Sequence, residues 1–149
     1  MVSVKGERDD EPHVADLLGA LFADVGAAFA GEEWRGLRLS HLRLLQAVPR
    51  DGTSVTDLAA RLGMTKQGCG QLVAPLVASG HLTSEPHPDD ARVRVVRRTR
   101  LGDQRARAVT RGLARLEDRW RERVGERRYA TFRGVLVELA AASDEPAPE

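Results

Sequence analysis

The sequence has one cysteine, two lysines and no long apolar run, and these shortages exclude several classes of protein. The single thiol, Cys69, cannot form an intramolecular disulfide, and together with four scattered histidines it does not match the spacing of a structural zinc site. No stretch approaches the ~20 apolar residues that a membrane-spanning helix needs. We therefore expect a chain from a reducing compartment, without a metal, a cofactor or a membrane partner.

The motifs of common enzyme classes are missing as well. The sequence contains no Gly-rich phosphate loop, no His-Glu-x-x-His and no Gly-x-Ser-x-Gly. The four histidines fall on separate predicted elements: His13, His41, His81 and His87. We therefore expect no enzymatic activity and no catalytic residue.

Length and composition are those of one globular domain. With 149 residues, 42% of them apolar and 30% charged, residues 1–149 are expected to form a single domain with its own core. Residues 1–12 carry acidic side chains where a signal peptide would have its apolar segment. The sequence therefore favours a cytoplasmic protein.

The net charge of +1 conceals a strong segregation of charge along the chain. Residues 1–36 carry eight acidic and three basic side chains, whereas residues 92–133 carry fifteen arginines and five acidic side chains. Such a basic block is expected of a protein that binds a polyanion, but a helix with a solvated arginine face has the same composition. Charge alone leaves both interpretations open.

Apolar periodicity predicts an amphipathic helix over residues 14–29. Three shorter helices follow, with Ser40, Ser54 and Thr65 as their expected N-cap residues. Gly63 supplies a left-handed stop between the second and third of these helices. The spacing therefore predicts two helices joined by a tight turn, as in a helix-turn-helix.

After these helices the spacing of apolar residues changes from a helical period to an alternating one. Residues 81–85 and 93–99 are predicted strands of a hairpin with a charged tip. A long helix over residues 101–124 follows, Gly125 should end it, and a last helix includes residues 129–139. The order predicts a mainly α fold with a small β-hairpin wing (α+β), which is a winged helix-turn-helix flanked by terminal helices.

In this order of elements the sequence resembles the MarR family of transcriptional regulators over about residues 12–141. Five segments in the family's order carry the resemblance: residues 58–67, 71–73, 79–82, 88–92 and 99–102. The resemblance implies a DNA-binding region at residues 38–100. It also implies a helical dimerisation region made of residues 12–36 and 101–142.

The helix after Thr65 is the expected recognition helix. Its apolar stripe should face the core: Cys69, Leu72, Val73, Leu76 and Val77. The remaining positions would then face a DNA groove, and we expect these to bind DNA: Thr65, Lys66, Gln67, Gly70 and Gln71. Glutamine can pair with adenine through two hydrogen bonds, and lysine can reach guanine or a phosphate. The alternative is a solvated helix face.

The predicted hairpin carries the family's Asp-x-Arg pattern at Asp90 and Arg92, with Arg94 next on the same strand face. The resemblance implies that Arg92 and Arg94 bind DNA, since an arginine suits the negative potential of a narrow minor groove. Asp90 would support the wing by a charge-assisted bond to arginine. Ala91 stands where the family usually has a basic residue, which removes one phosphate contact at most.

Two further features bear on regulation. The resemblance implies an effector pocket near the first two helices and the long helix, with Trp34 and His41 as candidate lining residues; a solvent-exposed histidine at a helix start is the alternative. Some family members sense oxidants through a thiol. The packing position of Cys69 instead favours a buried, inert side chain.

Together, these patterns predict a sequence-specific regulator that binds double-stranded DNA. We expect a ligand-responsive repressor that binds a near-palindromic operator as a homodimer, with a small-molecule effector. The alternative is a degenerate winged-helix protein that acts through protein contacts without binding DNA. It is favoured by Gly68, Gly70 and Pro75, which lower the stability of the recognition helix, and by Ala91.

Overall fold

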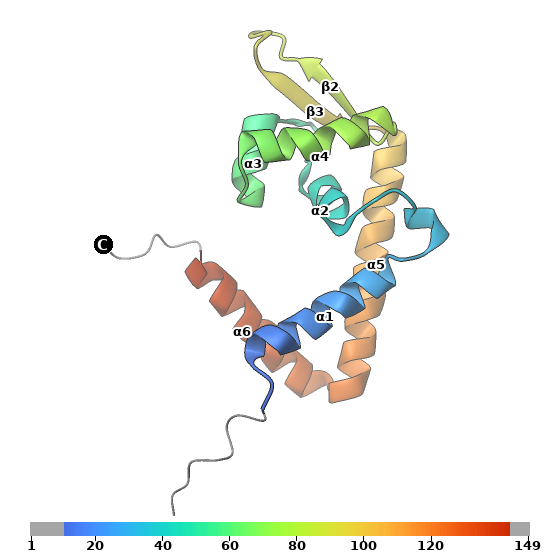
Figure 1. Cartoon of the computed structure of the whole chain (residues 1–149), viewed down its shortest axis with the longest axis vertical. Coiled ribbons are helices and arrows are strands. Elements are labelled where there is room, and N and C mark those ends of the chain that lie inside the picture. The colour runs from blue at the N-terminus through green and yellow to red at the C-terminus, as the bar shows by residue number, and fades with distance from the viewer. Residues whose placement is uncertain (1–10, 144–149) are drawn as a thin grey trace, which may run out of the picture. The chain divides into compact units, whose positions relative to one another are not determined.

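The computed structural model describes residues 11–143, which are mainly helical (Figure 1). Much of the acidic N-terminal segment and the tail after residue 143 lie outside this range. The chain separates into two compact units, and the boundary lies within the long helix between Gly112 and Leu113.

The first unit begins with α1 (Val14–Ala28), which confirms the predicted first helix. None of the α1 residues is buried, but the residue that ends the helix, Phe29, is. Its ring lies edge-on to Trp34 of the 3-10 helix η1 (Glu32–Trp34), with ring centroids 4.9 Å apart. A Cβ atom at Gly112 would come within 2.8 Å of the Phe29 ring, so this packing requires glycine at position 112.

The start of α2 (Leu39–Ala47) differs from the prediction. Ser40 is not the N-cap residue, because the helix begins two residues earlier than predicted and Arg38 occupies that position. The backbone N–H of Arg38 donates to Nδ1 of His41 at 3.0 Å, so a histidine at the third helical position reaches back and satisfies the N–H of the N-cap residue. His41 is buried, and burial together with the charge of Arg38 lowers its pKa.

The helix-turn-helix consists of α3 (Val55–Leu62) and α4 (Lys66–Ala78). Both predicted caps are confirmed: Ser54 Oγ accepts from the Asp57 N–H, and Thr65 Oγ1 accepts from the Gly68 N–H, each at 3.0 Å. Gly63 has a φ angle of +64°, which places it in the left-handed region that the prediction required. The turn therefore follows from the local sequence.

A small antiparallel sheet completes the winged domain. Its strands are β1 (Thr53–Ser54), β2 (Leu82–Pro86) and β3 (Arg94–Arg98), in the order β1-β3-β2. The hairpin β2–β3 confirms the predicted wing. β1 was not predicted, because two residues are too few to show an alternating pattern.

The core of the winged domain lies between the three helices and the sheet. Its buried members are Leu44, Leu45, Val48, Leu58, Ala59, Leu62, Cys69, Val73, Leu76, Leu82 and Val96. Each helix of the domain contributes to this cluster, so the position of α4 is set by packing against α2, α3 and the sheet.

The long helix α5 (Arg100–Val124) and the last helix α6 (Glu126–Ser143) confirm the predicted C-terminal helices. Gly125, with a φ angle of +86°, joins them. In the second unit the buried Tyr129 donates a hydrogen bond to Glu117 Oε2 at 2.8 Å, and the Arg121 guanidinium lies 4.9 Å from the Tyr129 ring centre. These contacts fix the turn between the two helices.

His81 lies where α4, the sheet and α5 meet. Its carbonyl accepts from the Thr99 N–H at 3.1 Å, and a Cβ atom at Gly102 would lie 2.0 Å from the same oxygen. His81 is 8% exposed, and its Nδ1 lies 2.7 Å from Ser79 Oγ. Its Nε2 is buried and has no hydrogen-bond partner within residues 11–143. Burial, and to a smaller extent the charge of Arg105, lowers the pKa of His81 below its ordinary value of 6.5.

We expect the His81→Leu variant to be less sensitive to acid than the wild type. The native protein favours the neutral imidazole, so as the pH falls below 6.5 the unfolded chain takes up a proton that native His81 resists. The free energy of unfolding of the wild type should therefore decrease more steeply between about pH 7 and pH 5. Urea unfolding at several pH values measures this, and equal pH slopes for the two proteins would contradict it.

Candidate nucleic-acid interface

The recognition helix α4 presents the expected side chains to solvent. Cys69, Val73 and Leu76 are buried, and Leu72 and Val77 are partly buried, so the predicted apolar stripe is confirmed. The predicted DNA-binding residues lie on the remaining surface: Thr65, Lys66, Gln67 and Gln71 are exposed, and Gly70 is partly buried.

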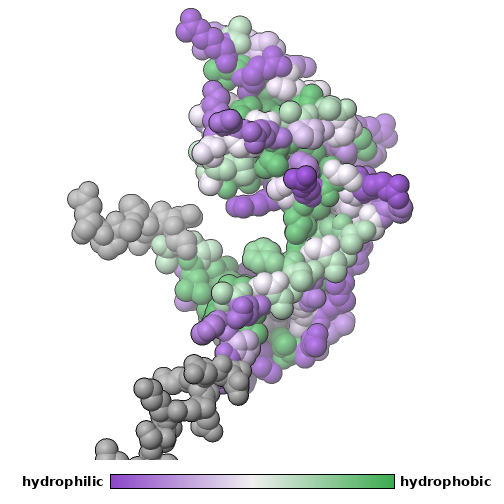
Figure 2. Space-filling view, in the orientation of Figure 1, coloured by the Kyte–Doolittle hydropathy of each residue, from purple (hydrophilic) through white to green (hydrophobic). Residues whose placement is uncertain are grey.

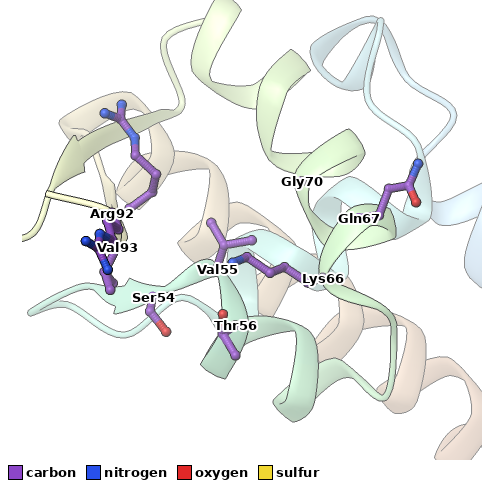
Figure 3. Close-up of a pocket in the computed structure, with 9 residues that line it drawn as sticks. Ser54, Val55, Thr56, Lys66, Gln67, Gly70, Arg92 and Val93 are labelled. Atoms are coloured by element: carbon purple, nitrogen blue, oxygen red, sulfur yellow. The ribbon is translucent and has the colours of Figure 1, made fainter. Parts of the chain in front are cut away.

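A cavity of about 590 Å³ lies between the start of α3, the first turns of α4 and the part of the wing where the tip leads into β3 (Figure 3). Figure 3 shows the Lys66 side chain extending from α4 toward the start of α3 and the wing. The cavity brings together five of the seven predicted DNA-binding residues: Lys66, Gln67, Gly70, Arg92 and Arg94. Thr65, which caps α4, and Gln71 do not line it.

The sequence analysis missed four lining residues, namely Val93 between the two wing arginines and three residues at the start of α3. Ser54 was considered only as a helix cap, and Val55 and Thr56 were not singled out. They reach the cavity because Thr53 pairs with Val96 and Ser54 with Val95, which holds the start of α3 beside the wing. This pairing joins segments about forty residues apart, and no local pattern indicates it.

The glycines of α4 have distinct surroundings. A Cβ atom at Gly70 would meet nothing within 4 Å, and Gly70 lines the cavity. A Cβ atom at Gly68 would lie 3.1 Å from the capping oxygen of Thr65. Gly70 therefore costs helix stability but leaves room for another molecule to approach the helix backbone.

Asp90 shapes the tip of the wing differently from the prediction. Its Oδ1 accepts from the backbone N–H of Arg92 at 3.0 Å, and its carbonyl accepts from the Val93 N–H at 3.0 Å. Asp90 thus bonds the backbone of Arg92 in place of the guanidinium. Among the residues that the structure describes, the Arg92 guanidinium has no hydrogen-bond partner and remains exposed.

The Arg94 guanidinium, unlike that of Arg92, forms hydrogen bonds across the hairpin. Its Nε donates to Ser84 Oγ at 3.3 Å, and a terminal guanidinium nitrogen donates to the Ser84 carbonyl. The two wing arginines are therefore not equivalent, since one is free and the other is bonded across the hairpin.

Charge around the wing is distributed unevenly. A second cavity of about 740 Å³ shares Ser54, Thr56 and Val93 with the first one. Its charged lining consists of four aspartates and one arginine: Asp51, Asp57, Asp89, Asp90 and Arg97. Because phosphates are repelled by carboxylates, an anionic partner would be directed to the cavity that holds Lys66 and Arg92.

The cavity beside Trp34 does not bring the two candidate effector residues together. Trp34 is buried and lines a cavity of about 370 Å³ formed by residues 29–37, but His41 does not line it. His41 is 7% exposed, so the alternative of a solvent-exposed histidine is wrong. The sequence analysis missed Arg105, whose guanidinium lies 5.0 Å from the centre of the Trp34 ring.

The thiol of Cys69 is completely buried, which confirms the predicted packing position, and burial raises its pKa. Over residues 11–143, no group of three or more His, Cys, Asp or Glu side chains could hold a metal ion. No helix in that range is both long and apolar enough to cross a membrane.

The helix-turn-helix α3–α4, with a hairpin beside the recognition helix, defines a winged helix-turn-helix protein. Comparison with known proteins agrees, since a model of the MarR family matches residues 35–93, from just before α2 into the wing. No curated protein sequence matches the chain.

Solved structures extend the likeness to nearly the whole chain. MarR is 20% identical, with a TM-score of 0.76 over 93% of this chain and 95% of that one. S. aureus MepR, in a complex with DNA, is 16% identical, with a TM-score of 0.74 over 89% and 99%. PcaV from Streptomyces coelicolor, with its natural ligand, is 20% identical, with a TM-score of 0.72 over 97% and 100%. The chain therefore has the MarR-family winged-helix fold, and the resemblance inferred from its motifs is confirmed.

Proposed function

We propose that this protein is a non-catalytic, sequence-specific regulator that binds double-stranded DNA. The observation that carries the proposal is the cavity at which Lys66 of the recognition helix and Arg92 of the wing lie together. DNA offers the complementary charge, and phosphate contacts supply much of the affinity of such proteins. The similar MepR structure, which contains DNA, supports the proposal. Such a regulator would act in the cytoplasm.

Different side chains would serve different parts of the duplex. The exposed Gln67 and Gln71 have amide groups suited to base edges in the major groove, and Thr65 lies at the helix N-terminus, where backbone N–H groups favour a phosphate. Arg92, at the wing tip, suits the minor groove. This division gives the recognition helix the role of selecting sequence and the wing the role of adding affinity.

We infer that the protein acts as a homodimer. On α1, Val14 is 72% and Phe22 is 68% exposed, although both are large and apolar. Apolar side chains also lie at the surface of α6 (Figure 2), namely Val135, Leu136, Val137 and Leu139. A second copy of the chain would bury these helices, and its twofold symmetry would match a near-palindromic operator.

We also propose that the regulator is a repressor that responds to a small molecule. The support comes from the surroundings of Trp34, which combine a cavity with an aromatic ring and the Arg105 charge, and from the similar PcaV structure, which holds a natural ligand. An aromatic ring beside a guanidinium suits an organic anion.

We expect DNA binding to weaken steeply as salt rises. If six or more phosphates are contacted, affinity should fall ~10³-fold between about 50 and 200 mM salt, because counterions return to the phosphates. A gel-shift titration on the DNA upstream of the protein's own gene measures this. A folded dimer that gives no shift at low salt would contradict the proposal and favour a winged-helix protein that acts through protein contacts.

We expect light scattering at micromolar concentration to give twice the chain mass of 16.3 kDa. Phe22→Glu should produce a monomer, because it places a charge in the apolar surface that a partner covers. Thr83→Glu, at an exposed position of the wing, is the matched control and should leave the dimer intact. A wild-type monomer would overturn the proposed dimer.

A further inference from the structure

The guanidinium of Arg94 is already committed to a contact within the wing. It donates to both the hydroxyl and the carbonyl of Ser84, on the opposite strand. Arg92, two residues earlier, is held only through its backbone, by the carboxylate of Asp90. To bind a phosphate through the same groups, Arg94 would first have to release two hydrogen bonds, whereas Arg92 would release none.

The contact crosses the hairpin beside a pair of residues whose backbones do not bond to each other. In the β2–β3 register Arg94 stands opposite Pro86. The next pair bonds through the His87 N–H and the Val93 carbonyl, and bonded pairs alternate with non-bonded ones in an antiparallel ladder, so Pro86 and Arg94 form a non-hydrogen-bonded pair. The Arg94 side chain crosses from β3 to a residue of β2 that precedes Pro86 by two positions, and so adds a side-chain bond between the strands at this end of the hairpin.

We propose that Arg94 is a positioning residue, which acts on DNA through Arg92 and does not contact DNA itself. The inference rests on the proposed DNA-binding function, and it revises the expectation that Arg94 is a DNA contact. With the strands tied at Ser84 and the tip held by Asp90, the backbone of Arg92 has few positions to adopt. A side chain presented in this way loses less conformational entropy on binding than one on a loose hairpin.

A double-mutant cycle separates positioning from direct contact. On a DNA fragment that the wild type binds, Arg92→Ala should weaken binding by about 5- to 150-fold, as expected for the loss of one base contact. Arg94→Ala alone should also weaken binding. The double variant should bind within about twofold of Arg92→Ala, because Arg94 has no route to DNA once Arg92 is gone. Losses that multiply, with a salt slope reduced by a further ~0.9, would show a direct phosphate contact and overturn the inference.

Two single variants test whether charge alone explains the effect. Arg94→Lys keeps the charge but cannot reproduce the two-pronged bond to Ser84, so it should bind as weakly as Arg94→Ala. Arg97→Ala removes the same charge from an exposed position of the same strand. The Arg97 guanidinium lies 4.0 Å from the exposed carboxylate of Glu85, a surface pair that contributes little, so this variant should bind like the wild type. Recovery of affinity with lysine, or an equal loss with Arg97→Ala, would overturn the inference.

Hydrogen exchange tests, in the absence of DNA, whether the bonds from Arg94 to Ser84 hold the two strands of the wing together. Amides of residues 87–93 should exchange faster in Arg94→Ala than in the wild type, and Arg97→Ala should leave them unchanged. Unchanged exchange in Arg94→Ala would overturn the inference. If the wild type failed to bind DNA, the proposed function would fail, yet the exchange data would still show whether Arg94 braces the wing.

Discussion

The candidate DNA interface depends on the pairing of β1 with β3. Two residues of β1, Thr53 and Ser54, bond to the central strand of the sheet and hold the start of α3 beside the wing. Because Gly63 and the Thr65 cap fix α4 relative to α3, the same pairing places Lys66 and Arg92 at one cavity. Without this pairing, the wing would be connected to the rest of the domain only through α4 and α5. The distance between Lys66 and Arg92 would then not be fixed.

Local physical chemistry made much of this domain predictable. Ser54, Gly63 and Thr65 act within three or four residues of their own positions, so their roles follow from the sequence, and the apolar stripe of α4 follows from helical periodicity. Ser40 was a wrong prediction for a related reason: any acceptor near a helix start can satisfy the free N–H groups, and His41 does so here. The sequence therefore predicts the presence of a helix better than it predicts the residue at which the helix begins.

What could not be predicted depends on long-range pairing or on a choice between bonding partners. β1 is too short to leave a pattern, so the contribution of Val55 and Thr56 to the cavity was missed. Sequence shows that Asp90 stands near arginines but not whether it bonds a guanidinium or a backbone N–H. Likewise, the different roles of Arg92 and Arg94 depend on whether Ser84 lies within reach across the hairpin.

The proposed function requires that α4 selects a DNA sequence and that two copies of the chain act on one symmetric site. Its most direct test is to sequence the fragments that the purified protein selects from a random DNA pool, and to repeat the selection with Gln71→Ala. The selected fragments should contain two inverted half-sites with centres about one helical turn (~34 Å), or a multiple of it, apart. The base preference within each half-site should change in the variant. An enrichment without symmetry, or one that is identical for both proteins, would contradict the proposed function.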